Sequence, residues 1–412
     1  VAVIIVNNVS GDPIGMLAGT DGGAVTIPVV MVSDLTGATL ANAAMTEDVV
    51  VFIGNKLGRF GNDIAIDENE VIRPRYSAAL ETLSQSATEL DIEVGAWIRN
   101  YGFNTQYNLE LTCDIAFGGS SIYNNFSMVD SLESGDSVFV TLPTFSQATY
   151  AAGEYDMNYN VISDSTENFP SDNMVNSKML INSTYISRGT VDPATGLPMV
   201  PADNYYRFTK NCLPFVDANA SRIGVRGLTF SATSTRTDSL FGKFVEVRAY
   251  EWDGTDAASM SEIAYAEYDY NANLNEQNVT VDFPRGFVLA DNQNYLFCVE
   301  NTTSDTIYFG ASEIGYGQSI TTYQEYTSLF EQTNGTQSFF SDISPAISVE
   351  TLPAAVASVE EDVEEELTAY PNPAVDMISI PVGNIEVKEV VIYDVTGKVV
   401  SAQNVTNANN VS

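Results

Sequence analysis

Oxygen-bearing side chains cluster in one polar stretch of the chain, residues 164–173. Four of them could ligate a hard cation: Asp164, Glu167, Asp172 and Asn173. Calcium takes about six to eight oxygen ligands from carboxylates, amides and carbonyls, so this composition suits it. The spacing lacks the ordered repeat of an EF-hand loop, however, and a polar loop between two strands would have the same composition. The stretch is therefore a candidate calcium site with an ordinary loop as the alternative.

The chain contains no histidine. This absence removes Ser-His-Asp and Cys-His nucleophile activation, histidine general bases and histidine-ligated zinc. The 54 Asp and Glu residues could include an acid/base pair, but no spacing singles one out, because such pairs are defined by their separation in space. We assign no catalytic residue, and calcium is the one candidate cofactor. Whether these residues include an enzyme stays open, and a non-enzymatic protein is the favoured interpretation.

The three cysteines are too few and too scattered for a metal knuckle or a disulfide scaffold. Cys113 lies in residues 107–115, where the odd positions are apolar, so we expect an inert thiol that points into a core. Cys212 and Cys298 could form a single disulfide in an oxidising compartment. They could equally stay reduced, because a sequence does not supply the geometry that a bridge needs.

Aromatic side chains in the second half of the chain suggest a possible sugar platform. Trp252, Tyr250 and the tyrosines within residues 265–270 would line it. Their alternation with charged residues is equally typical of ordinary strands, and we favour that interpretation. We likewise expect Trp97 to be a core residue.

The chain is strongly acidic, with 17 Lys and Arg against 54 Asp and Glu and a net charge of −37. Such a field repels nucleic acid and anionic membrane surfaces, so we expect no nucleic-acid partner. No apolar run is long enough to span a bilayer, which predicts a protein that is not membrane-embedded.

The first segment, residues 1–57, has the order strand, Gly-rich loop, strand and short helix. The strands are expected at residues 1–6 and 25–32 and the helix at residues 35–44. Residues 3–8, 19–21 and 27–33, with Gly37, resemble the second half of a protease-associated domain. That family comprises non-catalytic modules of secreted peptidases, so the resemblance implies a partial α/β module that binds peptides or holds domains together.

The middle of the chain reads as two β-sandwiches. Residues 75–188 contain period-two strands, with a bulge expected at Gly95, and residues 94–102, 131–136 and 153–155 resemble adhesion-like immunoglobulin modules. Residues 189–202 hold three prolines and two glycines and are expected to form a linker. Residues 203–350 show strands joined by long polar loops, a pattern that suits a jelly-roll-like sandwich.

The last part of the chain is an independent unit behind a spacer. Residues 352–368 include six carboxylates in seven positions, which repel one another and predict an extended acidic linker. In residues 369–412, two prolines stiffen the entry and a Gly-containing turn predicts a hairpin. The most specific motifs are Tyr370-Pro371-Asn372-Pro373 and Tyr393-Asp394-Val395-Thr396-Gly397-Lys398.

These motifs resemble the type A C-terminal sorting domain of type IX secretion. The resemblance implies a Bacteroidota-type bacterium, a type IX translocon as partner, and a location outside the cell or on its surface. It also implies tethering to surface lipopolysaccharide or release by cleavage, and further strands after Ser412. The chain opens directly on an apolar strand with no visible signal peptide, so we expect an export signal before Val1.

Together these observations predict a mainly β, multi-domain protein with a partial protease-associated α/β module, two β-sandwich modules and a small C-terminal β sorting domain. The favoured function is non-enzymatic, in adhesion, surface structure or filament assembly, with glycans, peptides or copies of the chain itself as partners. Two alternatives stay open. One is the ancillary C-terminal region of a secreted peptidase, and the other is a glycan-binding accessory protein.

Overall fold

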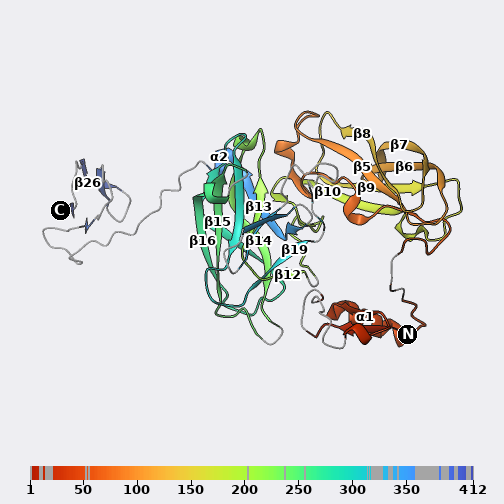
Figure 1. Ribbon diagram of the computed structural model, residues 1–412. Coiled ribbons are helices and arrows are strands. Elements are labelled where there is room, and N and C mark those ends of the chain that lie inside the picture. Colours follow the sequence, from red (N-terminus) through yellow and green to blue (C-terminus); the bar gives the residue numbers. More distant parts are fainter. Residues whose placement is uncertain are drawn as a thin grey trace. The chain divides into compact units, whose positions relative to one another are not determined.

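A computed structural model gives the fold of this protein. It describes residues 2–8, 13, 22–51, 53, 56–201, 204–235, 238–254, 257–312, 314, 316, 328–332, 337–340, 343–357, 380–381, 389–393, 398–404 and 410–411. The chain divides into two compact units, Val1–Ser358 and Val359–Ser412. It is mainly β and contains several sheets, which confirms the predicted fold class (Figure 1).

The N-terminal segment forms a small α/β element. Strands β1 (Val3–Val6) and β2 (Val29–Val32) pair in parallel, η1 spans Gly22–Ala24, and helix α1 (Asp34–Ala44) follows β2. Ser33 caps the helix, since its hydroxyl accepts a hydrogen bond from the Thr36 N–H at 3.0 Å. Gly37 is required because a Cβ there would lie 2.3 Å from the Val6 side chain. The expected strand, strand and helix are confirmed.

The first β module, residues 64–187, packs two sheets against each other. Leu109, Leu111 and Cys113 alternate toward the core with no exposure, as their period-two pattern predicted. One sheet has the order β3-β5-β8, and the other contains β4, β10, β9, β6 and β7. The elements are β3 (Ile64–Ala65), η2 (Glu68–Glu70), β4 (Ala78–Leu80), η3 (Glu81–Leu83), β5 (Asp91–Asn100), β6 (Gln106–Phe117), β7 (Ser120–Leu132), β8 (Ser137–Ser146), β9 (Gly153–Ile162), η4 (Pro170–Asp172), β10 (Met174–Asn182) and β11 (Tyr185–Ser187).

Two local expectations in β5 need correction. The register shifts between Ile92 and Val94, so the bulge lies before the expected position at Gly95. Gly95 instead permits a close strand approach, because a Cβ there would lie 2.7 Å from the Val140 carbonyl oxygen. Trp97 is half-buried rather than fully in the core, and its ring centroid lies 5.6 Å from that of Phe139.

The second β module, residues 205–353, is also built from two packed sheets. One sheet has the order β16-β15-β18-β13-β20-β21, and β14 of the other pairs with β17, β19 and β23. The elements are β12 (Tyr205–Tyr206), β13 (Phe208–Phe215), η5 (Ala220–Arg222), β14 (Ile223–Thr233), β15 (Phe244–Trp252), η6 (Ala257–Ser259), β16 (Ser261–Asp269), β17 (Gln277–Val288), β18 (Asn294–Glu300), β19 (Tyr308–Ser312), β20 (Ser328–Gln332), β21 (Gln337–Phe340), β22 (Ser344–Pro345) and β23 (Ile347–Pro353).

One sheet runs through both β modules. Its strand order is β12-β19-β14-β23-β11-β4-β10-β9-β6-β7, so β23 of the second module pairs directly with β11 of the first. We call this pairing the junction and the two modules together the β body. Because hydrogen bonds continue across the junction, the β body has no break in its backbone pairing there.

The expected linker at residues 189–202 is folded where it is described, up to residue 201. Val191 forms a β-bridge with Pro198, and the Met199 N–H donates to the Thr190 carbonyl at 2.9 Å. Gly196 has a positive φ of 72° and closes the turn. The prolines and glycines that suggested a linker therefore serve a tight hairpin turn, for which the same residue types are favoured.

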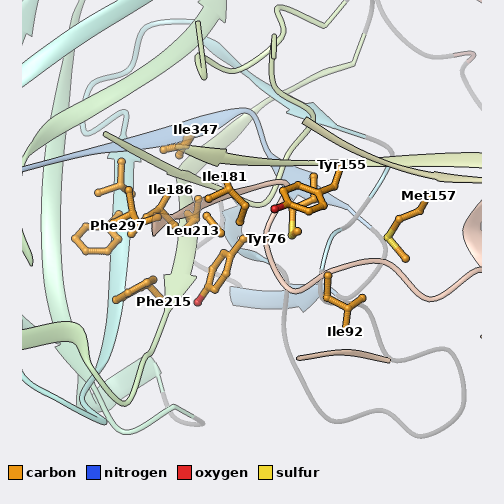
Figure 2. Close-up of a cluster of buried hydrophobic side chains, with 14 of the residues drawn as sticks. Tyr76, Ile92, Tyr155, Met157, Ile181, Ile186, Leu213, Phe215, Phe297 and Ile347 are labelled. Atoms are coloured by element: carbon orange, nitrogen blue, oxygen red, sulfur yellow. The ribbon is translucent and has the colours of Figure 1, made fainter. Parts of the chain in front are cut away.

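Aromatic and aliphatic side chains fill the core beside the junction (Figure 2). The rings of Tyr76 and Phe215, one from each β module, have centroids 5.8 Å apart. Arg188 is 1% exposed, and its Nε donates to the Pro214 carbonyl at 3.0 Å while its guanidinium lies over the Tyr76 ring. The two modules thus share a hydrophobic core as well as a sheet.

The C-terminal segments follow the β body. Strand β23 continues to Pro353 and helix α2 spans Ala354–Ala357, so the residues expected at the start of the acidic linker form regular secondary structure. The remainder of that predicted linker lies outside the described residues. In the second unit, β24 (Ile380–Pro381) pairs with β27 (Asn410–Val411), and β25 (Glu389–Tyr393) pairs antiparallel with β26 (Val399–Asn404). The expected hairpin strands are confirmed.

Candidate functional site

The loop between β9 and β10 carries the four residues predicted to bind calcium. The Asp164 carboxylate accepts a hydrogen bond from the Asn108 side-chain amide. The Glu167 carboxylate accepts from the backbone N–H groups of Ile64 at 3.2 Å and Asn168 at 3.0 Å. These two side chains therefore hold the loop against neighbouring segments.

Asp172 and Asn173 lie together at the other end of this loop, where η4 leads into β10. The Asn173 amide donates to the Val161 carbonyl at 3.2 Å, and the Asp172 carboxylate contacts the ammonium of Lys56. Among the residues that the structure describes, no group of three or more His, Cys, Asp or Glu could hold a metal ion. The cation at Asp172 is Lys56, and calcium binding at this loop stays a prediction.

Lys56 occupies a cage of acidic and aromatic side chains, which we call the Lys56 cage. Its Nζ lies 2.9 Å from Oδ1 of Asp63 and contacts Oδ2 of Asp172. The same atom lies 4.7 Å from the ring centroid of Tyr101 and 4.9 Å from that of Phe169. Aromatic faces attract cations and exclude water, so the lysine is held by both charge and ring contacts.

Asp63 is the most unusual member of the Lys56 cage. Its side chain has 0% exposure, and apart from the ion pair with Lys56 neither carboxylate oxygen accepts a hydrogen bond. Oδ1 of Asp172 and Oδ1 of Asn173 are also buried without a hydrogen-bond partner. Buried oxygens normally find donors, because leaving one unpaired costs roughly 1–3 kcal/mol. The carboxylates of Asp63 and Asp172, which carry three of these oxygens, both contact the Lys56 amine.

The backbone fixes the Lys56 cage in place. The Asp63 carbonyl accepts hydrogen bonds from the N–H groups of Tyr101 at 2.7 Å and Gly102 at 3.0 Å. The Tyr101 hydroxyl donates to Asp67 at 2.8 Å, and burial, followed by this hydrogen bond, raises the pKa of Tyr101 to about 12. Sequence reasoning missed Lys56, Asp63, Tyr101 and Phe169. The one available signal was the scarcity of basic residues, 17 in the chain, which makes each lysine notable.

Cys212 and Cys298 form a disulfide inside the second β module. They lie directly opposite each other on β13 and β18 and are 0% exposed. Cys113 is a free buried thiol, and burial, with a smaller contribution from Asp114, raises its pKa to about 12. The thiol is therefore protonated and inert at neutral pH, as its position in the pattern predicted.

The aromatic side chains considered for a sugar platform are mostly inside the second β module. Trp252, Tyr250 and Tyr270 are 6%, 8% and 1% exposed. The Tyr250 hydroxyl donates to Glu300 at 2.7 Å, so its polar end is already engaged. Tyr265 and Tyr268 are half-buried. Buried rings cannot stack on an external sugar, which favours the ordinary-strand interpretation for the first three.

The C-terminal unit supplies the clearest functional signal. Its hairpin of β25 and β26 carries Tyr393 at the end of the first strand and Lys398 just before the second, and Lys398 is exposed. Residues 368–412 match the family described as secretion system C-terminal sorting domain. The protein is exported by type IX secretion. Tyr370, Pro371, Asn372, Pro373, Asp394 and Gly397 of the predicted sorting motif lie outside the described residues.

A sorting domain of this kind means that the protein is secreted or displayed on the cell surface. Among the described residues, no helix has the length and apolar character needed to cross a membrane. No curated protein matches the chain.

Two solved structures show limited likeness. The CARDB domain of the PF1109 protein from Pyrococcus furiosus, solved in complex with di-metal ions, is 16% identical, with a TM-score of 0.22 over 29% of this chain and 93% of that domain. The secreted serine protease VesC from Vibrio cholerae is 10% identical, with a TM-score of 0.19 over 59% of this chain and 50% of that protein. Neither likeness is close enough to support a conclusion about this chain.

Proposed function

We propose that this chain is a non-enzymatic surface protein of a Bacteroidota-type bacterium, in which the β body acts as a stiff spacer in adhesion or surface assembly. The junction carries this proposal. Ile186, Ser187 and their partners Val349 and Ser348 join the two β modules by backbone pairing, and all four residues are buried. A spacer that bends little between its modules is what display at a cell surface requires.

The junction also explains how force would pass through the chain. Strand β23, which leads to α2 and then to the sorting unit, lies between β14 and β11 in the continuous sheet. A pull applied through the C-terminal unit would therefore act on a central strand with partners on both sides rather than on an edge strand. Central strands resist peeling because hydrogen bonds on both edges must break.

Assignments of the individual modules belong to the same proposal. We propose residues 1–57 as a partial protease-associated domain, 75–188 as an immunoglobulin-like sandwich, and 203–350 as a jelly-roll-like sandwich. The parallel β1 and β2 followed by α1 support the first, and the paired sheets support the other two. The proposed partners are the translocon, surface lipopolysaccharide and copies of the chain, with glycans or peptides as ligands.

Deletion of the β body in cells that export the chain tests this function. We expect a variant lacking residues 64–353 to be exported through residues 368–412 but to reduce cell attachment to surfaces or the integrity of the surface layer. A variant lacking residues 368–412 serves as control and should fail in export. If cell attachment is unchanged and peptidase activity in the medium is lost, the result would instead favour the alternative that this chain is the ancillary C-terminal region of a secreted peptidase. Loss of binding to one glycan alone would favour a glycan-binding accessory.

A further inference from the structure

The Lys56 cage contains the three groups needed to form an amide bond between side chains. A primary amine, Lys56 Nζ, contacts a carboxyl group, Asp172, and a second carboxyl group, Asp63, lies 2.9 Å from the same nitrogen. We propose that Lys56 and Asp172 become joined by an intramolecular isopeptide bond, with Asp63 as the acid–base residue. This inference does not depend on the proposed function, since it concerns only the chemistry of these side chains.

The reaction needs the neutral amine of Lys56 and the neutral carboxyl group of Asp172. An ammonium is not nucleophilic and a carboxylate is a poor electrophile, so a proton must pass from Lys56 to Asp172 before attack. The groups are placed for this transfer, because Lys56 Nζ contacts the Asp172 carboxylate, while the Tyr101 and Phe169 rings flank the nitrogen and the Asp63 side chain has no exposure. The Lys56 and Asp172 side chains are 25% and 26% exposed, so both are largely shielded.

The step balances without any further reactant. The neutral amine attacks the Asp172 carboxyl carbon, and protonated Asp63 donates its proton to the carboxyl oxygen as charge develops there. The C–N bond forms, and Asp63 then accepts a proton from the nitrogen and passes it to one hydroxyl, which departs as water when the C–O bond breaks. The remaining hydroxyl gives its proton back to Asp63 as the amide carbonyl forms. The products are a secondary amide and one water molecule, and Asp63 is regenerated.

The close placement of the two reacting groups accelerates the reaction. Fixing two reacting groups in contact can correspond to effective concentrations of roughly 10⁵ M or more. Two hydrogen bonds to the Asp63 carbonyl hold its backbone in place. Its carboxylate oxygens accept no hydrogen bond, so they are available to the reacting groups. This account also gives a role to Oδ2 of Asp63 and Oδ1 of Asp172, two buried oxygens that have no hydrogen-bond partner.

The bond would join two separate parts of the first β module. Lys56 precedes β3, whereas Asp172 lies two residues before β10, and β10 leads through a short turn to β11 at the junction. A covalent link at this place would carry a pull on the N-terminal segment directly to β10 and β11. Strand β3, which is two residues long, would then be bypassed.

Peptide mapping of the full folded chain tests this proposal. The protein is unfolded, reduced and digested with trypsin and a second protease, and the peptides are identified by mass spectrometry. We expect the Lys56 and Asp172 peptides to be joined, with a mass one water below their sum, and no tryptic cleavage after Lys56. Finding the two peptides unlinked in folded protein would overturn the proposal.

Matched variants assign the roles. Lys56→Arg keeps the positive charge and should abolish the link, and Asp63→Asn should abolish it while the circular dichroism spectrum is retained. Asp172→Asn should form the same amide with loss of ammonia in place of water. Lys178→Arg is the control, because Lys178 also lies between two carboxylates, 2.7 Å from Glu154 and 3.2 Å from Asp156, but is 52% exposed. A link that persists in Lys56→Arg, or disappears in Lys178→Arg, would contradict the assignment.

Discussion

Ile186 of β11 and Val349 of β23 lie opposite each other in the continuous sheet, although they lie far apart in the chain and each belongs to a different β module. Their side chains are 1% and 0% exposed. The pair places an apolar contact and backbone hydrogen bonds at one point. The junction is therefore part of the core of the protein rather than a surface contact between two finished domains.

Shortening a buried side chain at the junction should destabilise the whole β body. We expect Ile186→Ala to lower the free energy of unfolding by about 2–5 kcal/mol, because it removes buried methyl groups and leaves a cavity. Ile162→Ala is the matched control, since Ile162 lies on β9 and is 48% exposed, and its effect should stay within about 0.5 kcal/mol. Urea unfolding followed by circular dichroism measures both. Equal effects of the two substitutions would count against a buried junction.

Removal of the disulfide should be costly. The bridge closes a loop with a sequence separation of 86 residues, and its loss should lower stability by about 2–5 kcal/mol. The measurement compares denaturant midpoints of the wild type and the double variant Cys212→Ala and Cys298→Ala. Thiol titration of the unfolded, unreduced wild type should count one free thiol, that of Cys113. A count of three would show that the bridge does not form.

Alkaline pH should weaken the fold through buried tyrosines. Burial raises the pKa of Tyr150 to about 12, whereas an unfolded phenol titrates near pH 10. Between these values the unfolded state releases a proton that the folded state keeps. The contribution of Tyr150 is therefore complete below about pH 10 and is lost as the pH rises toward about 12.

The matching experiment compares unfolding free energies at about pH 9 and about pH 11. In Tyr150→Phe the loss over this interval should be smaller than in wild type by about 1 kcal/mol, even though the variant also lacks the hydrogen bond from the Tyr150 hydroxyl to the Leu90 carbonyl. Tyr107→Phe, at a side chain that is 55% exposed, should show the wild-type loss. An identical pH dependence in all three proteins would refute the role of Tyr150.

Local patterns predicted the strands well but not their partners. The alternation in residues 107–115 indicated β6, and the apolar runs at residues 1–6 and 25–32 indicated β1 and β2, because each signal lies within one short segment. The pairing of β11 with β23 has no local signature, since β11 ends the first β module and β23 ends the second, far along the chain. Short β11, three residues long, also offers too little pattern to detect.

Site residues were likewise predicted only where their signal is contiguous in the sequence. The sorting unit was recognised because its motif is contiguous, and the match to residues 368–412 agrees with it. The Lys56 cage is assembled from four distant segments, near residues 56, 63, 101 and 169–172. The sequence indicated the acidic loop that contributes Asp172 but not the lysine that faces it, so the oxygen atoms there suggested calcium.

The two tryptophans test most directly whether the β modules form one body. Trp97 lies in the first β module and Trp252 in the second, so Trp252→Phe leaves a reporter for the first module and Trp97→Phe leaves one for the second. Urea unfolding with the disulfide intact is followed by fluorescence in each variant and by circular dichroism for the whole chain. Circular dichroism gives the change in urea midpoint that each substitution causes, and this change is subtracted from the fluorescence midpoint of that variant. A shared sheet and core then predict the same corrected midpoint for both tryptophans. Two separated transitions, with one module unfolding while the other stays folded, would contradict the account.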